Sequence, residues 1–127
     1  MTYSAPGWRL DDHIVVDSSW LIYEDYQAYI SAENKDQANL ILNSLLKKKL
    51  VAGGMMLNAP ARFWWKGKIT DMNYYNISVF TIEKHKQAII TDVKRNSVEV
   101  VPMVWFIEIE GNKELFKWIE ESIDKHD

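Results

Sequence analysis

Apolar and polar positions alternate in some stretches of this chain and recur at helical spacing in others. Residues 20–31 are rich in aromatic and β-branched side chains, which predicts a strand centred on residues 26–30. Asn34 followed three positions later by Gln37 is typical of a helix start. The apolar positions behind it repeat every three or four residues, which predicts an amphipathic helix over residues 35–50.

A long strand and its return are predicted next. Two glycines at positions 53 and 54 interrupt the helical pattern, and the apolar stretch that follows predicts a strand through Lys66. Pro60 within it indicates an edge strand or a bulge, because proline cannot donate to a sheet ladder. Residues 71–73 are expected to reverse the chain, and residues 75–81 alternate as a return strand.

The second half of the chain repeats the strand and helix order. A helix is expected over residues 84–96 and a strand over residues 101–110. A last helix is marked by three apolar positions at helical spacing, Leu115, Ile119 and Ile123. The order β-α-β-β-α-β-α predicts an α+β protein, a ferredoxin-like sandwich with an extra C-terminal helix.

Composition fits one domain with an additional N-terminal segment. The chain has 127 residues, of which 47% are hydrophobic, enough for one well-buried core. Residues 1–19 differ in composition from the rest and are expected to form an extension docked on the core through Trp8, Leu10 and Ile14. Residues 20–127 are expected to form the ferredoxin-like domain.

Charge and cysteine content limit the possible functions. The net charge of −3 gives no general field for nucleic acid or anionic membranes, so neither is expected as a partner. The absence of cysteine rules out thiolate nucleophiles and cysteine-ligated metal. No signal peptide or bilayer-spanning apolar run is recognisable, so a cytoplasmic location is expected.

Trp64 and Trp65 are the most informative pair in the chain. Neighbouring strand residues point to opposite faces of a sheet, so the two indoles need two different covers. We expect one indole to enter the chain's own core and the other to need a partner subunit.

These residues also carry a resemblance to a known family. Several features of the chain resemble the CutA divalent-cation tolerance family. They are the segment running from the helix into Gly53, the aromatic pair, the Trp65-Lys66-Gly67-Lys68 turn, Pro102 and a Trp-containing last helix. The resemblance extends from about residue 26 to residue 123. It implies a fold like that of PII signalling proteins and a homotrimer assembled through long β-hairpins.

The resemblance also implies a role in tolerance of copper and other divalent cations, but the family's metal-candidate residues are mostly replaced here. The family's cysteine after the first helix aligns with Gly53. Its His-Pro-Tyr-Glu-x-Pro-Glu motif aligns with residues 97–103, where only Pro102 is kept and Glu99 is the nearest acid. No metal-ligating set is therefore predicted, and a divalent cation is implied by the resemblance alone.

A cationic and aromatic cluster is the best candidate for a ligand site. Lysine or arginine can hold an anion while an indole stacks on a flat ring, as in a nucleotide. The candidate ligand-binding residues are Arg62, Trp64, Trp65, Lys66, Lys68 and Glu99. The competing interpretation is that both lysines are solvated turn charges and the indoles are interface packing.

No enzyme is predicted. The three histidines stand alone in the sequence, and no nucleophile, acid–base pair or phosphate loop is recognisable. Three hypotheses remain: a PII-like binding or regulatory trimer with a small anionic ligand, a divalent-metal protein of the cation-tolerance type, and a structural or partner-binding trimer.

Overall fold

The computed structural model describes residues 25–123 of the chain. The expected extension over residues 1–19 and two of the histidines, His13 and His126, lie outside the described residues. The described elements are β1 (Asp25–Ala32), α2 (Lys35–Lys47), β2 (Gly53–Trp65), β3 (Lys68–Ile82), the short 3₁₀ turn η1 (Glu83–His85), α3 (Lys86–Asn96), β4 (Val104–Glu108) and α4 (Lys113–Ser122).

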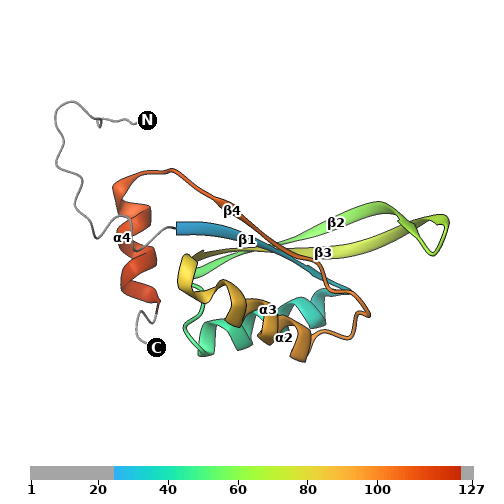
Figure 1. The fold of residues 1–127 in the computed structure, drawn as a ribbon, viewed down its shortest axis with the longest axis horizontal. Helices are drawn as coiled ribbons and strands as arrows, with labels where there is room; N and C mark the ends of the chain where they lie inside the picture. Colours follow the sequence, from blue (N-terminus) through green and yellow to red (C-terminus); the bar gives the residue numbers. More distant parts are fainter. Residues whose placement is uncertain (1–24, 124–127) are drawn as a thin grey trace.

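The strands form one antiparallel sheet in the order β2-β3-β1-β4, with α2 and α3 lying side by side on one face (Figure 1). This confirms the α+β, ferredoxin-like fold with an extra C-terminal helix. The order also places β2 at an edge of the sheet. Pro60 is tolerated there because an edge strand need not donate every N–H to a neighbour.

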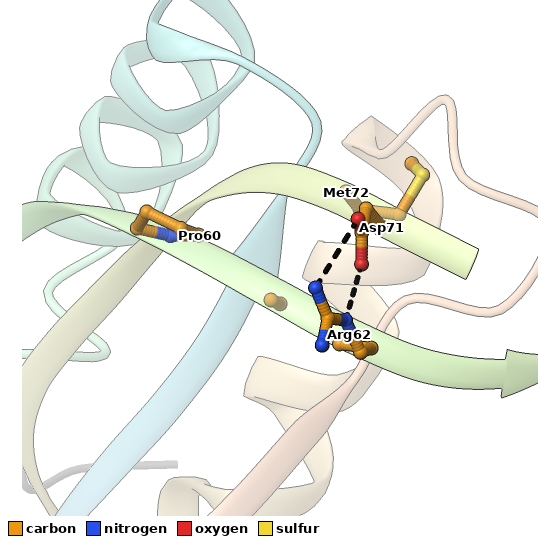
Figure 2. Close-up of a pocket in the computed structure, with 5 residues that line it drawn as sticks. Pro60, Arg62, Asp71 and Met72 are labelled. Carbon is orange, nitrogen blue, oxygen red and sulfur yellow. Dashed lines mark hydrogen bonds and ion pairs between the residues drawn. The ribbon is translucent and has the colours of Figure 1, made fainter. Parts of the chain in front are cut away.

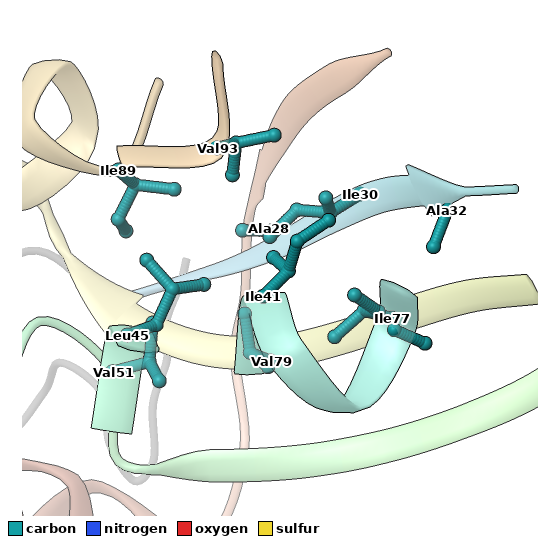
Figure 3. Close-up of a cluster of buried hydrophobic side chains, with 11 residues drawn as sticks. Ala28, Ile30, Ala32, Ile41, Leu45, Val51, Ile77, Val79, Ile89 and Val93 are labelled. Atoms are coloured by element: carbon teal, nitrogen blue, oxygen red, sulfur yellow. The ribbon is translucent and has the colours of Figure 1, made fainter. Parts of the chain in front are cut away.

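The main core lies between the sheet and the helix pair α2 and α3. Alternate residues of β1 and β3 point toward the helices, where Ile30 and Ile77 meet Ile41 and Leu45 from α2 and Ile89 from α3 (Figure 3). All five are fully buried. The predicted helical spacing therefore matches the face that the structure buries.

The extra helix α4 covers only one end of the opposite sheet face. Ile119 packs there against Ile82, and the rings of Trp118 and Phe80 meet edge to face with their centroids 6.1 Å apart. Figure 1 places α4 at the end of the sheet away from the β2–β3 hairpin. The rest of this face, here called the open face, carries exposed apolar side chains from both edge strands, namely Met55, Leu57, Trp105 and Ile107.

Two sequence-based expectations about the hairpin are wrong. Residues 71–73 do not reverse the chain, because they pair within β3 with residues 60–62 of β2. The reversal lies at Lys66 and Gly67, which have φ of 50° and 80°. Glycine adopts such angles without strain, and positive φ at both positions suits a two-residue hairpin turn.

The second correction concerns the paired tryptophans. Neither indole enters the chain's own core: Trp64 is 74% exposed and Trp65 is 45% exposed. They do point to opposite faces, but the hairpin projects beyond the helices (Figure 1), so no helix or strand among residues 25–123 covers either face. Both faces of the tip lack a cover among the described residues.

Element boundaries differ modestly from those predicted. The first helix ends at Lys47 instead of residue 50, because Lys49 takes a φ of 55° and turns the chain toward β2. The last strand is confined to Val104–Glu108. Residues 101–103 precede it, where Pro102 has no N–H to donate.

A candidate ligand-binding hairpin

The hairpin of β2 and β3 holds five of the six candidate ligand residues. Its strands pair without interruption from Gly53 opposite Phe80 to Trp65 opposite Lys68. Strand alternation then sorts the side chains: Arg62 and Trp64 share one face, and Trp65 and Lys68 share the other. The candidate residues therefore belong to two surfaces of one ribbon.

Arg62 is already engaged by a carboxylate. Its Nε donates to Oδ1 of Asp71 at 2.6 Å, and a terminal nitrogen lies 3.5 Å from Oδ2 (Figure 2). The pair lines a shallow groove of about 410 Å³ together with Pro60, Ala61 and Met72. Both partners are exposed, so the ion pair itself contributes little to stability. Asp71 offsets the positive charge of Arg62, so Arg62 binds an anion more weakly than the sequence suggested.

Lys66 and Lys68 differ from Arg62. The Lys66 ammonium lies 5.7 Å from the centroid of the Trp65 ring, within the range of a cation–π contact. Among residues 25–123, no ion pair joins Lys66 or Lys68 to a carboxylate. Their charges are therefore available to a bound anion beside an exposed indole.

Glu99 lies apart from the hairpin tip. The hydroxyl of Ser31, at the end of β1, is 3.2 Å from both carboxylate oxygens of Glu99 and donates to them. Burial raises the pKa of Glu99, the hydrogen bond from Ser31 opposes that rise, and the negative charge of Glu33 adds to it. The carboxyl is thus held inward by β1, away from Lys66 and Lys68 of its own protomer.

Tyr74 and Glu33 are further members of the Glu99 environment that sequence reasoning missed. The pKa of Tyr74 is raised first by burial and then by the negative charges of Glu99 and Glu33. Tyr74 lies on β3, where the hairpin leaves the sheet. No local motif could reveal this grouping, because it joins β1, β3 and the segment before β4.

Metal-binding donors do not gather in the described part of the chain. Among residues 25–123, no group of three histidine, aspartate or glutamate side chains is placed to hold an ion. His85 is buried in the short turn before α3. The residues described in one protomer therefore do not fit a copper or zinc site, which needs convergent imidazoles or carboxylates.

Comparison with known proteins assigns the chain to a family. A family profile described as CutA1 divalent ion tolerance protein matches residues 26–122. The chain belongs to this family. It is 32% identical over 97 residues to the divalent-cation tolerance protein CutA of Archaeoglobus fulgidus, across 76% of this chain and 95% of the relative. It is 26% identical over 102 residues to CutA of Pyrococcus horikoshii, across 76% of this chain and 96% of that protein.

Solved structures agree with this assignment. The CutA structure from Archaeoglobus fulgidus, described as periplasmic, is 30% identical, with a TM-score of 0.76 over 79% of this chain and 99% of its own. CutA1 from Oryza sativa has the same fold, with a TM-score of 0.76 at 23% identity over 81% and 96% of the two chains. The resemblance inferred from the aromatic pair and the turn is thus confirmed. Within residues 25–123, no helix is long and apolar enough to cross a membrane.

Proposed function

We propose that this CutA-family chain is a non-enzymatic, cytoplasmic binding or regulatory protein of PII-like type that works as a homotrimer. Its ligand is a small anion with a flat ring, held at the hairpin tip by Lys66 and Lys68 and stacked on an indole. The observation that carries the proposal is the exposed Lys66 ammonium over the Trp65 ring, with no carboxylate of residues 25–123 paired to it.

The assembly part of the proposal rests on apolar surface that residues 25–123 of one protomer leave uncovered. Trp64 is exposed on one face of the hairpin and Trp65 on the other. The open face adds Met55 and Leu57 on β2 and Trp105 on β4, all exposed. Contiguous apolar patches of this kind mark interaction sites, and closed symmetric rings are a common way of covering them.

The ligand is tested by isothermal titration with adenine nucleotides and with inorganic phosphate. We expect the double variant Lys66→Ala/Lys68→Ala to bind a nucleotide at least about tenfold more weakly, because it loses two charge-assisted contacts. Lys94→Ala removes an exposed lysine from α3 and serves as the control, with unchanged affinity expected. Equal nucleotide affinity in the double variant and the control would contradict the anion site.

A divalent-cation role is the second candidate, favoured by the names of the relatives and by one structural feature. Glu99 and Glu33 lie close enough for the charge of Glu33 to raise the pKa of Glu99, and a bound cation would relieve that repulsion. Two carboxylates of one protomer are too few for a copper or zinc site, so a second copy would have to add donors. The replacements at Gly53 and residues 97–103 favour the first candidate.

The cation role is tested by thermal unfolding with and without Cu²⁺ and Zn²⁺. A ligand that binds only the folded protein at about 100 times its Kd adds about 2.7 kcal/mol to the free energy of unfolding. A stabilisation that Glu99→Gln abolishes would favour the cation role. If neither the metals nor the nucleotides stabilise the protein, a structural or partner-binding trimer becomes the preferred function.

A further inference from the structure

Helix α4 depends on its docking against the sheet more than on its own sequence. It has a single buried residue, Ile119, and it follows a connection, residues 109–112, that has no regular structure. No side-chain hydrogen bond caps its start at Asn112, and its last turn carries Glu120 and Glu121 but no basic residue, which opposes the helix dipole. A helix of 10 residues is marginal in water on its own, so α4 stays folded only while it lies on the sheet.

Two carboxyl groups meet where α4 lies on the sheet. Asp25 is the first residue of β1, and Figure 1 shows α4 beside this end of the strand. Glu120 follows the buried Ile119 on α4 and is, like Asp25, partly buried. One carboxylate oxygen of Asp25 is buried and has no hydrogen-bond partner among the described residues. The junction therefore holds two acids, one of which has an oxygen without any compensating donor.

The surroundings of Asp25 in the described part of the chain offer no compensating cation. On β3 the residue opposite Asp25 is the apolar Ile82, and after β4 the Ile109 N–H donates to the Asp25 carbonyl oxygen at 3.2 Å. The charged residues that neighbour these positions along the chain are Glu83, Lys84, Glu108 and Glu110. Among residues 25–123, no ion pair joins Asp25 to a cation, and Glu120 is the residue whose negative charge acts on Asp25.

Docking of α4 is therefore coupled to the proton on Asp25. Burial, and then the charge of Glu120, raises the pKa of Asp25 from 3.8 to about 6 in the docked state. Undocking brings water to Asp25 and removes Glu120, so the pKa falls back toward 3.8. Because the docked state holds the proton more tightly, docking is strongest below pH 3.8, weakens as pH rises to about 6, and stays weakened above that value.

We propose that α4 is a pH-dependent cover, which closes on the end of the open face when Asp25 is protonated and loosens when Asp25 and Glu120 are both ionised. The cover is a local device of the fold: the helix pair α2 and α3 packs on the other face of the sheet and does not take part. The inference does not depend on the ligand proposed for the hairpin, so either proposal can fail alone.

The surface beneath the cover is apolar. Phe80 meets the Trp118 ring there, and Ile82 packs against Ile119. Both β3 residues lie on the same sheet face as Met55, because side chains two positions apart on a strand share a face. Loosening of α4 thus extends the open face by two apolar side chains, which makes the area available for association larger at neutral pH than at acid pH.

Amide hydrogen exchange in the full-length chain, measured by mass spectrometry, tests the cover. After correction for the intrinsic exchange rate, we expect the protection of α4 to be about fivefold lower at pH 7.5 than at pH 4.5, a value reduced for the partial exposure of Asp25. Peptides from α3 are the internal control and should keep their protection. Constant protection of α4, or an equal loss in α3, would overturn the cover.

Three variants assign the effect to the two carboxyl groups. Asp25→Asn resembles the protonated acid, so we expect α4 to stay protected at both pH values. Glu120→Gln should reduce the pH dependence, because it removes the repulsion. Glu121→Gln, an exposed change on the same helix, is the matched control and should leave the pH dependence as it is. A pH dependence that survives Asp25→Asn, or that Glu121→Gln reduces as much as Glu120→Gln does, contradicts the proposal.

A thiol placed beneath α4 separates undocking from fraying of the helix ends, and the natural absence of cysteine makes the label specific. We expect Phe80→Cys to react with a methanethiosulfonate reagent about fivefold faster at pH 7.5 than at pH 4.5, relative to a free cysteine peptide at the same pH. Adding Asp25→Asn should make the two relative rates equal. Val79→Cys, buried on the opposite face, is the control for global opening. Equal relative rates in Phe80→Cys alone would show that α4 does not undock.

Discussion

Gly54 on β2 lies where the backbone of β3 leaves no room for a side chain. A Cβ at this position would lie 1.9 Å from the carbonyl oxygen of Ser78 on β3, a backbone atom that cannot move aside. We expect Gly54→Ala to lower the free energy of unfolding by about 3 kcal/mol, the upper range for overpacking, in urea denaturation. Gly67→Ala meets no atom within 4 Å but has a φ of 80°, so we expect a loss of only about 1 kcal/mol. Equal losses in the two variants would contradict the steric argument.

Asp25 is the residue with the clearest pH dependence. One of its carboxylate oxygens is buried without a hydrogen-bond partner among the described residues, and burial, followed by the negative charge of Glu120, raises its pKa from 3.8 to about 6. The ionised form is therefore disfavoured in the folded state. The destabilisation is absent below pH 3.8, grows as pH rises to about 6, and stays complete above that value.

We therefore expect Asp25→Asn to stabilise the protein at pH 7.5 by about 1 kcal/mol, a value reduced for the solvent screening of a half-exposed group. The gain should disappear near pH 4, which thermal unfolding at both pH values measures. Asp71→Asn is the control, since Asp71 is exposed and paired with Arg62. A gain that is equal at both pH values would remove the electrostatic explanation.

The helix α4 has a single buried residue, Ile119. Ile119 is fully buried against Ile82, whereas Leu115 and Phe116 on the same helix are only partly buried. We expect Ile119→Ala to lower the free energy of unfolding by about 3 kcal/mol, through lost burial and the cavity left behind. Lys117→Ala, an exposed change on the same helix, should shift stability by less than about 0.5 kcal/mol. An equally small effect of Ile119→Ala would mean that α4 contributes little to the fold.

The β2–β3 hairpin has complete backbone pairing but leaves apolar side chains at its tip exposed. Its ladder runs unbroken to the turn, yet its tip exposes indoles on both faces. A two-stranded ribbon is marginal in water without a cover on at least one face. The hairpin therefore connects the fold of one protomer to the assembly proposed for several.

The whole molecule is expected to have the mass of three chains. Three copies of a 14.9 kDa chain give about 45 kDa, which light scattering after size exclusion can measure at micromolar concentration. The exposed apolar side chains that residues 25–123 present on the open face and at the hairpin tip are the reason for this expectation. The melting temperature should also rise with protein concentration, because association stabilises the folded chain. A mass near 15 kDa together with a constant melting temperature would contradict the trimer.

The sequence by itself determined the order of the elements and the face that each one buries. Helical spacing identified Ile41 and Leu45, and alternation identified Ile77 and Val79, because local periodicity reflects which side chains leave water. The start of α2 at Asn34 could also be predicted from neighbouring residues, because the Asn34 side chain accepts a hydrogen bond from the Gln37 N–H at 2.9 Å. The chain reversal was misplaced because aspartate and asparagine also favour turns, while backbone pairing selected Gly67.

Only the tertiary structure decided where the candidate site lies and what it lacks. Glu99 is held by Ser31, 68 positions away in the chain, and Arg62 is neutralised by Asp71 across the hairpin. Both contacts depend on strand order and register, which bring together residues that no local pattern relates. The exposure of Trp64 and Trp65 has the same origin: alternation sent them to opposite faces, but the length of the hairpin beyond the helices left both uncovered.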